Sequence, residues 1–304
     1  MEINKDWIIA DSPEDKIKKL ISSNARYIIV PKYLVIHYTA GDTAESAINW
    51  FMTAQDKGNP DRIAAHIVVD VDGTITQLVP FNRRANHAGY SVWDRISAFN
   101  DHAIGIEIVN PGYLEKLPDG SYRRHIGQDK NKKPAYKAYP ASIASKLFVG
   151  NHKHKFWTDS DNHIWFQFPK VQLDAVYKLS SLLIKHYQLI SAIGHDDISP
   201  ARKPDPGPAF PWDDFKNAVF GKTDQVGKIF KVTENGTNFR NNPSKENSPI
   251  KSLNKDYEVG LIETNGSWYK VYLVNERKDV VNPDGSSKKE IGWIHNSLLI
   301  LKNN

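Results

Sequence analysis

The side chains best suited to chemistry lie in three short segments. His37 stands near the end of an apolar run, YLVIHY, and Glu107 stands between isoleucines in AIGIEIV. The third segment, GHDDISPARKPDPGPAFPW, combines His195, Lys203 and Asp205 with five prolines, which stiffen a loop because each fixes φ. Two histidines, an aspartate and an open position match the ligand set of a catalytic zinc. A carboxylate that accepts a proton from water and a lysine that stabilises an oxyanion would complete a metal-assisted amide hydrolase.

Each segment also has a plainer interpretation. A single histidine in a strand, such as His37, is more often a hydrogen-bonded core residue than a ligand. The proline-rich segment could be an ordinary surface loop. Glu107 could belong to a buried ion pair, although Gly105 on the same strand face leaves room for a ligand.

The composition narrows the chemistry further. The chain has 304 residues, 11 histidines and no cysteine, which excludes disulfide frameworks, thiol nucleophiles and thiolate zinc sites. Any bound metal must therefore take nitrogen and oxygen ligands. Apolar residues make up 40% and charged residues 25%, as in ordinary folded proteins. The length suits about two domains of ~150 residues.

The charge is mildly positive, with a formal net charge of +5 and a pI of about 9.0. Residues 225–304 hold 12 Lys+Arg and 9 Asp+Glu, and the remainder holds 28 and 26. We therefore expect no strongly basic block and no nucleic-acid partner, although an anionic polymer such as a cell wall would suit this charge. No apolar run reaches the length of a membrane span, and no signal peptide is visible.

Apolar periodicity predicts an α/β domain up to about residue 215. Asp72-Gly73 is a strong hairpin signal between two strand-like runs. The polar, lysine-rich and aperiodic stretch 113–165 is interpreted as a long loop or insertion. The expected helices are 11–22, 43–57 with Thr43 as its cap, and 170–190 with the stripe Val176, Leu179, Leu183 and Tyr187; the expected strands include 33–38 and 103–109.

The character of the sequence changes after Gly221. Short strand-like runs separated by Asn, Gly, Pro and Ser turns indicate a small all-β module without a helix. With the boundary near 222–227, the predicted domains are 1–224 and 225–304.

Several motifs together resemble the zinc-dependent N-acetylmuramoyl-L-alanine amidases, the type 2 amidase family, which is similar in fold to peptidoglycan recognition proteins. GHDDISPARKPDPGP matches the family pattern G-H-x-D-I-x-P-x-R-K-x-D-P-G-P, and YLVIHYTA, AAHIVVDVDGTITQLVP, NHAGYSVW and AIGIEIVN follow the family's order and spacing. The resemblance covers roughly residues 30–215. It implies a mixed sheet flanked by helices, and cleavage of the amide between N-acetylmuramic acid and L-alanine.

Carried over position by position, the resemblance makes His37, His195 and Asp205 the zinc ligands and Glu107 and Lys203 the catalytic pair. It implies one Zn²⁺ per chain and peptidoglycan or muropeptides as the partner. We expect a monomer at the cell envelope, periplasmic or secreted, in preference to the cytoplasm. Two rival functions stay open: a peptidoglycan-binding protein that has lost catalysis, and a zinc peptidase acting within the stem peptide.

Three further residues are candidates for binding the stem peptide or a sugar ring: Arg84, His87 and Trp93. Arginine suits carboxylates because its donors form a planar fork. Asn86 replaces an aromatic residue that many relatives carry before His-Ala-Gly, which leaves the specificity of the groove open.

Three other histidines stand in or near these motifs and receive other roles. We expect His66, on a strand, to have a hydrogen-bonded structural role. His152 and His154, in the lysine-rich NHKHK, could mimic a metal pair, but the lysines favour a solvated surface.

The C-terminal module resembles a bacterial SH3-like domain. The resemblance rests on Asn238-Phe239-Arg240 with Asn242-Pro243, on Ser267–Val271, and on Gly292–Ile294. It implies a module that holds the enzyme on peptidoglycan, and a packing module without a ligand is the alternative.

Overall fold

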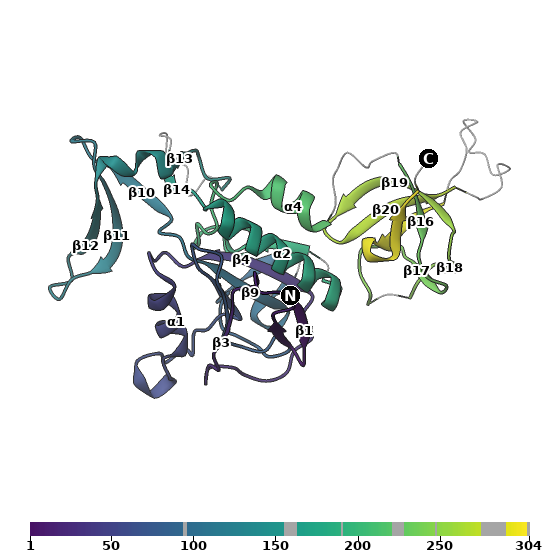
Figure 1. Cartoon of the computed structure of the whole chain (residues 1–304), viewed down its shortest axis with the longest axis horizontal. Helices are drawn as coiled ribbons and strands as arrows, with labels where there is room; N and C mark the ends of the chain where they lie inside the picture. Colours follow the sequence, from purple (N-terminus) through teal and green to yellow (C-terminus); the bar gives the residue numbers. More distant parts are fainter. Residues whose placement is uncertain are drawn as a thin grey trace. The chain divides into compact units, whose positions relative to one another are not determined.

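Two compact units make up the chain in the computed structural model (Figure 1). The first comprises Met1–Leu179 and Ala192–Pro211, and the second comprises Ser180–Ser191 and Trp212–Asn304. The expected boundary near 222–227 lies outside the described residues. These are 1–93, 96–154, 163–189, 191–220, 228–246, 248–274 and 290–302.

A mixed sheet that includes β4 and β9 forms the centre of the first unit (Figure 1). It has six strands in the order β15-β4-β9-β5-β6-β3. β4, β9 and β5 run parallel to one another, and β6 returns antiparallel beside β5. The two expected strands and the hairpin at Asp72-Gly73 are confirmed. The bounds are Ser191–Gly194 (β15), Tyr33–Tyr38 (β4), Ala103–Ile108 (β9), Ile67–Val69 (β5), Ile75–Gln77 (β6) and Ile17–Lys19 (β3).

The register of this sheet sorts its side chains onto two faces. His37 pairs with Glu107, and Glu107 pairs with Val68. These three side chains share one face, because paired residues on neighbouring strands point the same way. The alternate row, which includes Ile36 and Ile106, is fully buried on the other face. The register therefore sets a candidate metal ligand beside a candidate catalytic carboxylate.

Helix α1 (Ala44–Met52) begins as predicted, because the Thr43 hydroxyl accepts the N–H of Ser46 at 3.3 Å. It ends before the expected residue 57, and a 3₁₀ turn follows at Gln55–Lys57. Phe51 of α1 belongs to the same buried apolar cluster as Val68 of β5. This helix therefore packs on the face of the sheet that carries His37.

Helix α2 (Lys170–Tyr187) confirms the helix predicted at 170–190, although it ends three residues earlier than expected. Val176, Leu179 and Leu183 of its apolar stripe are fully buried. Gln172 donates from Nε2 to the carbonyls of Val69 (3.1 Å) and Val109 (2.9 Å), which ties the helix to the ends of β5 and β9. Two shorter helices are α3 (His195–Ile198) and α4 (Trp212–Phe220).

The helix expected at 11–22 is wrong. The Asp15 N–H donates to Ser12 in a single turn, and Ile17–Lys19 then extends as β3, parallel to β6. Without β3, one edge of β6 would have unpaired backbone groups. The hydrogen bonds that this edge forms with Ile17–Lys19 outweigh a weak local helix signal.

The stretch 113–165 also differs from the expected loop. Its described residues form a five-stranded antiparallel sheet in the order β12-β11-β10-β14-β13. Leu114, Tyr122 and Tyr139 are the buried centre of a small apolar cluster in this sheet. The strands are Tyr113–Lys116 (β10), Tyr122–Gln128 (β11), Pro134–Tyr139 (β12), Leu147–Val149 (β13) and Ile164–Phe166 (β14).

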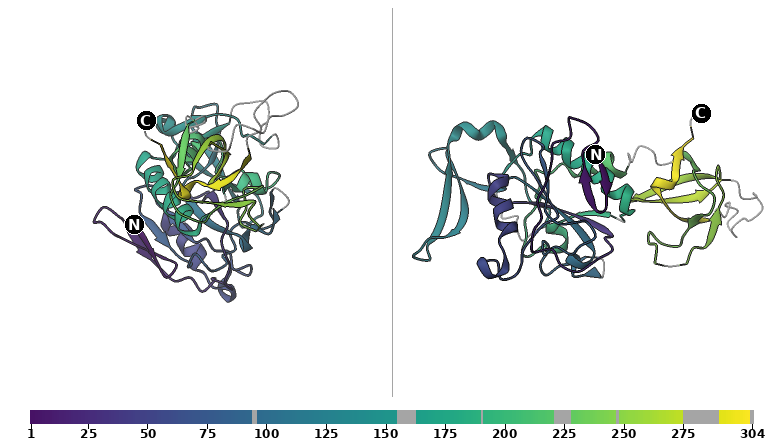
Figure 2. Two further views of the ribbon diagram at one scale, coloured as in Figure 1. Left: turned by 90° about the vertical axis from the view of Figure 1, so that its right-hand side faces the viewer. Right: turned by 60° about the horizontal axis from the view of Figure 1, so that its bottom comes forward.

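Strands β11 and β12 extend away from the central sheet as a two-stranded hairpin, which is hereafter called the arm and spans residues 122–139 (Figures 1 and 2). Every residue from His125 to Pro134 is exposed. The arm has no apolar face in this part, which explains why its sequence shows no strand periodicity.

The second unit is rich in β-structure. A five-stranded antiparallel sheet, in the order β21-β20-β19-β16-β22, and the hairpin β17-β18 surround a core that includes Phe239, Val259 and Ile294. Gly292 is required by close packing, because a Cβ there would lie 2.5 Å from the Phe239 ring. The strands are Ile229–Val232 (β16), Thr237–Phe239 (β17), Lys251–Leu253 (β18), Glu258–Asn265 (β19), Trp268–Leu273 (β20), Ile291–His295 (β21) and Leu299–Leu301 (β22).

Among the described residues, none of the helices has the length and apolar character of a membrane span. Two short hairpins complete the first unit. The hairpins are Glu2–Asn4 with Trp7–Ile9 (β1, β2) and Val92–Trp93 with Ile96–Ser97 (β7, β8).

Candidate metal centre

Three of the predicted residues converge on one buried point. His37 comes from β4, His195 is the first residue of α3 after β15, and Asp205 comes from the proline-rich loop. The Nδ1 atoms of the two histidines are 2.8 Å apart, and Asp205 Oδ2 lies 3.1 Å from His37 Nδ1 and 3.0 Å from His195 Nδ1. All three side chains are buried. Their three donor atoms could therefore bind one ion.

Hydrogen bonds on the far side of each ring indicate that both Nδ1 atoms present lone pairs. His195 Nε2 lies 3.1 Å from the carbonyl of Ala88, which can only accept, so the proton of His195 is on Nε2. His87 Nε2 faces the carbonyl of Ala103 at 3.4 Å, which leaves His87 Nδ1 to accept from His37 Nε2 at 3.0 Å. Metal-binding histidines typically donate their second ring nitrogen in this way.

This arrangement fits a cation. Two imidazole lone pairs and a carboxylate oxygen within 3.1 Å of one another would repel unless a positive ion lay among them. Burial and the nearby His195 lower the pKa of His37 to about 4, so this ring is neutral at pH 7. Burial acts to raise the pKa of Asp205, but the two histidines hold it well below its ordinary value. A neutral imidazole and an ionised carboxylate are the forms that bind zinc.

Glu107 lies beside this centre with an unused oxygen. It pairs in register with His37, and its Oε2 is buried with no hydrogen-bond partner among the described residues. Burial, reinforced by the charge of Asp205, raises the pKa of Glu107 well above its ordinary value, and Lys203 acts in the opposite sense. A buried carboxylate without a partner is costly to a fold and is characteristic of a group that handles protons.

A histidine from the insertion supports the loop that carries the ligands. His152, which is fully buried, places Nε2 3.0 Å from Asp196 Oδ2 and 3.1 Å from the carbonyl of Pro204. Asp196 follows the candidate ligand His195, and Pro204 lies between Lys203 and Asp205. The Asp196 N–H also donates to the Asp205 carbonyl at 2.7 Å. His152 therefore joins both ends of the ligand loop.

The solvated surface expected for His152 and His154 is thus wrong for His152 and only partly correct for the half-buried His154. The sequence contained a signal that could have revealed this: Asp196 occupies the variable position of the G-H-x-D-I pattern. An acidic residue there needs a partner if it is buried. His154, Asp196 and Asp197 form a second possible metal cluster. However, the Lys153 ammonium already lies 3.1 Å from Asp196 and 2.8 Å from Asp197.

The three expected substrate-binding residues occupy different environments. His87 is buried and contacts the candidate ligand His37, so it does not line an open groove. Arg84 donates from Nε to Asp101 at 2.6 Å, which occupies its guanidinium. Trp93 is partly exposed and lies edge-on to Tyr33, with 6.2 Å between ring centroids. Among these three, Trp93 alone has exposed surface and no polar partner among the described interactions.

Two other residues of the motifs hold the centre in place. His66 has the predicted structural role: its Nδ1 accepts the Gly105 N–H at 3.0 Å, and its Nε2 faces the Arg83 carbonyl at 2.8 Å. Arg202 received no role from the sequence, yet its Nη2 donates to the carbonyls of Ala88 (2.8 Å) and Tyr90 (3.0 Å). It thereby fixes the loop whose Ala88 carbonyl orients His195.

The comparison with protein families agrees with this geometry. The family model for N-acetylmuramoyl-L-alanine amidase matches residues 27–208. This range includes the three converging residues as well as Glu107 and Lys203. The chain belongs to the N-acetylmuramoyl-L-alanine amidase family. Its first unit accordingly has a mixed α/β fold like that of other amidases.

Curated relatives within the amidase family are similar over part of their length. The N-acetylmuramoyl-L-alanine amidase AmiD of Escherichia coli strain K12 is 30% identical over 190 residues, which are 60% of this chain and 50% of AmiD. The 1,6-anhydro-N-acetylmuramyl-L-alanine amidase AmpD of Haemophilus influenzae is 30% identical over 158 residues, 52% of this chain and 59% of AmpD. The chain thus spans between half and three fifths of these relatives.

Solved amidase structures are similar at a lower level. The crystal structure of a selenomethionine AmpD derivative has a TM-score of 0.47 at 22% identity and covers 72% of this chain and 99% of its own. The complex of Escherichia coli AmiD with anhydro-N-acetylmuramic acid-L-Ala-D-γ-Glu-L-Lys has a TM-score of 0.43 at 25% identity. It covers 66% of this chain and 63% of its own.

Proposed function

We propose that this chain is a zinc-dependent peptidoglycan hydrolase. It cleaves the amide bond between N-acetylmuramic acid and the L-alanine of the stem peptide. The observation that carries the proposal is the convergence of His37, His195 and Asp205 within 3.1 Å, beside Glu107, whose buried Oε2 has no hydrogen-bond partner in the part of the chain that the structure describes. Its relatives AmiD and AmpD are named as amidases of this bond type.

His37, His195 and Asp205 would hold one zinc ion, which supplies a Lewis acid for the amide carbonyl and acidifies its bound water. Glu107 accepts a proton from the attacking water and passes it to the amide nitrogen. The C–O bond forms first and places negative charge on the carbonyl oxygen. The C–N bond then breaks as the nitrogen takes the proton from Glu107, which leaves a carboxylate on muramic acid and a free L-alanine amine. The Lys203 ammonium stabilises the negative charge that develops on the carbonyl oxygen.

The second unit is proposed as a bacterial SH3-like, wall-binding domain that begins near residue 225, with 1–224 as the catalytic domain. Support comes from the way its motif segments pack together: Arg240 forms a bridge with Trp293, and Gly292 packs against Phe239. We also propose a monomer and expect the protein to act at the envelope.

Digestion of purified sacculi, followed by mass spectrometry of the new ends, tests the reaction. The amidase releases stem peptides with free L-alanine N-termini, and a chelator abolishes the release. New N-termini within the stem would support a zinc peptidase instead. Binding without any release would support a peptidoglycan-binding protein that has lost catalysis. A parallel digestion of anhydro-muropeptides establishes whether soluble fragments are also substrates.

A further inference from the structure

The arm carries a charge that is out of proportion to its length. Residues 122–139 contain six Lys+Arg and one Asp+Glu, a net of +5, which equals the net charge of all 304 residues. The rest of the chain is therefore neutral overall. The expectation of no strongly basic block is wrong, because a comparison of residues 225–304 with the remainder averages over this hairpin.

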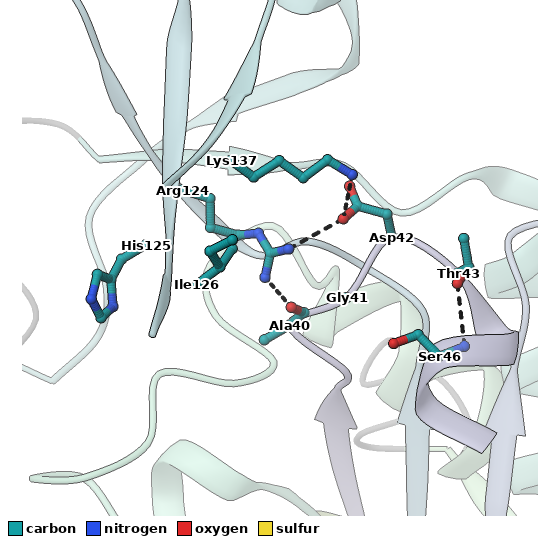
Figure 3. A pocket seen from close by; sticks show the side chains of 9 residues that line it. All are labelled: Ala40, Gly41, Asp42, Thr43, Ser46, Arg124, His125, Ile126 and Lys137. Atoms are coloured by element: carbon teal, nitrogen blue, oxygen red, sulfur yellow. Dashed lines mark hydrogen bonds and ion pairs between the residues drawn. The ribbon is translucent and has the colours of Figure 1, made fainter. Parts of the chain in front are cut away.

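The positive charges of the arm fall into two groups. At its root, Arg124 and Lys137 both reach Asp42, at 3.2 and 2.9 Å (Figure 3). Tyr139 donates to the same carboxylate at 2.8 Å. Arg123 forms two hydrogen bonds to Glu115, at 2.7 and 2.9 Å. The root charges thus hold the arm in place.

The charges at the tip have no such partner. Lys130, Lys132 and Lys133 form no ion pair among the described residues, and all three are exposed. The one nearby acid, Asp129, instead accepts the backbone N–H groups of Asn131 and Lys133 at 2.8 and 2.9 Å, so it shapes the turn.

Protection of a sheet edge does not explain these lysines. Charged residues often lie along an edge strand, where they oppose pairing with another chain. Lys137 is the only charged residue of the edge strand β12, whereas the three tip lysines lie in the turn between β11 and β12. Exposed side chains concentrated at the end of a hairpin are suited to contact a partner.

The position of the root relates the arm to the metal centre. Arg124 donates to the carbonyl of Ala40, three residues after His37 along the same chain segment (Figure 3). A shallow pocket lies at this junction, between the arm and the start of α1, and its lining includes Asp42, Ser46, Arg124 and Lys137. With seven residues at about 3.3 Å each, β11 carries the tip roughly 20 Å from the root. A ligand that contacts both the centre and the tip must be long.

We propose that the arm is a contact surface for polymeric peptidoglycan, which its tip lysines recognise through the free carboxylates of neighbouring stem peptides. The inference rests on the proposed amidase function and extends it to the form of the substrate. A polymer repeats its carboxylates along each strand, so one stem can lie at the metal centre while others meet the tip.

Replacing the tip lysines tests the proposal. K130Q/K132Q/K133Q is compared with a matched control, K5Q/K18Q/K57Q, which removes three exposed lysines elsewhere in the first unit and changes the net charge equally. Both are sedimented with sacculi that have been stripped of phosphate polymers by acid, at low and high salt. We expect the tip variant to bind roughly tenfold more weakly at low salt, the difference to vanish at high salt, and the control to bind like wild type. K130R/K132R/K133R should restore binding.

Other outcomes would overturn the proposal. Equal binding of the tip variant and wild type removes the arm from recognition. Loss of wild-type binding on acid stripping assigns the arm to a phosphate polymer, and equal arm-dependent binding to anionic vesicles or double-stranded DNA makes it a general polyanion contact. Turnover of soluble muropeptides is measured for every variant. A wild-type chain that cleaves nothing contradicts the amidase function, whereas normal cleavage with unchanged sedimentation contradicts the arm alone.

Discussion

Glu107 is the residue whose role depends most on its surroundings. A glutamine there keeps the shape and removes the proton-accepting group, so Glu107→Gln should reduce turnover by roughly 10²- to 10⁴-fold. The variant should still bind one zinc per chain, because the three converging residues are unchanged. Metal analysis beside the sacculus digestion checks both statements. Loss of stoichiometric zinc would place Glu107 among the ligands and undo its assignment as the proton carrier.

His152 provides a second prediction at the same scale. His152→Ala removes the contact that joins Asp196 to Pro204, so the ligand loop should hold its metal roughly 10- to 100-fold more weakly. Competition with a chelator measures this affinity, and the visible spectrum of the cobalt-loaded protein reports the ligand geometry.

The neighbouring His154→Ala serves as the control, because that ring is partly exposed and 3.5 Å from Asp197. It should leave both measurements near wild type. If His152→Ala lowers the melting temperature of the metal-free chain but changes neither readout, the histidine only stabilises the fold.

His66 makes the stability of the first unit depend on pH. Burial lowers its pKa to about 4, and the ordinary value is 6.5. Between these values the unfolded chain binds a proton that the folded chain does not, so the free energy of unfolding falls as the pH decreases from 6.5 towards 4. By pH 5 the loss due to His66 should be about 2 kcal/mol. Denaturant unfolding of wild type and His66→Gln at pH 7 and pH 5 measures it; equal slopes with pH would contradict the assignment.

Among the elements, β9 is restricted by what lies over it. A Cβ at Gly105 would lie 2.5 Å from the ring of His87, which in turn orients His37. Gly105→Ala should therefore displace His87, weaken zinc binding and destabilise the unit by about 1–3 kcal/mol. Gly41→Ala is the matched control, because a Cβ there meets ordinary contacts at 3.5 Å. Metal titration and thermal unfolding of both variants test this prediction. Normal zinc affinity in Gly105→Ala would show that the position of His87 over β9 does not affect the metal centre.

The helices and strands also show which local sequence patterns predicted secondary structure correctly. The capped start of helix α1 and the Asp72-Gly73 hairpin have strong local signals and appear as predicted. The sheet of residues 113–166 had a comparable signal, Asp119-Gly120, between β10 and β11. Its exposed strands lack alternating apolar residues, so the pattern was dominated by lysines. The helix prediction for residues 11–22 was wrong for a different reason: the segment has a local helix signal, but its pairing with β6 depends on residues far along the chain.

At the scale of the whole molecule, the second unit should contribute to wall binding. Deleting residues 225–304 is expected to weaken sedimentation with sacculi while sparing the cleavage of soluble muropeptides. Because α4 clusters with the second unit, a companion deletion of 212–304 avoids exposing its buried Phe215. Zinc content and thermal unfolding verify that the remainder stays folded. Unchanged sedimentation in both truncations would count against an anchoring role.

The sequence by itself determined the candidate residues of the centre, since His37, His195, Asp205, Glu107 and Lys203 stand in motifs whose residue types and order are specific. It also determined the strands that carry His37 and Glu107, because apolar periodicity is a local property, but it did not predict the short helix that begins at His195. Tertiary structure alone decided the surroundings: that His87 contacts His37, that His152 holds the loop around His195 and Asp205, and that Arg84 is occupied by Asp101. Burial and pairing between distant segments determine those roles, and neither is encoded in the spacing of neighbouring residues.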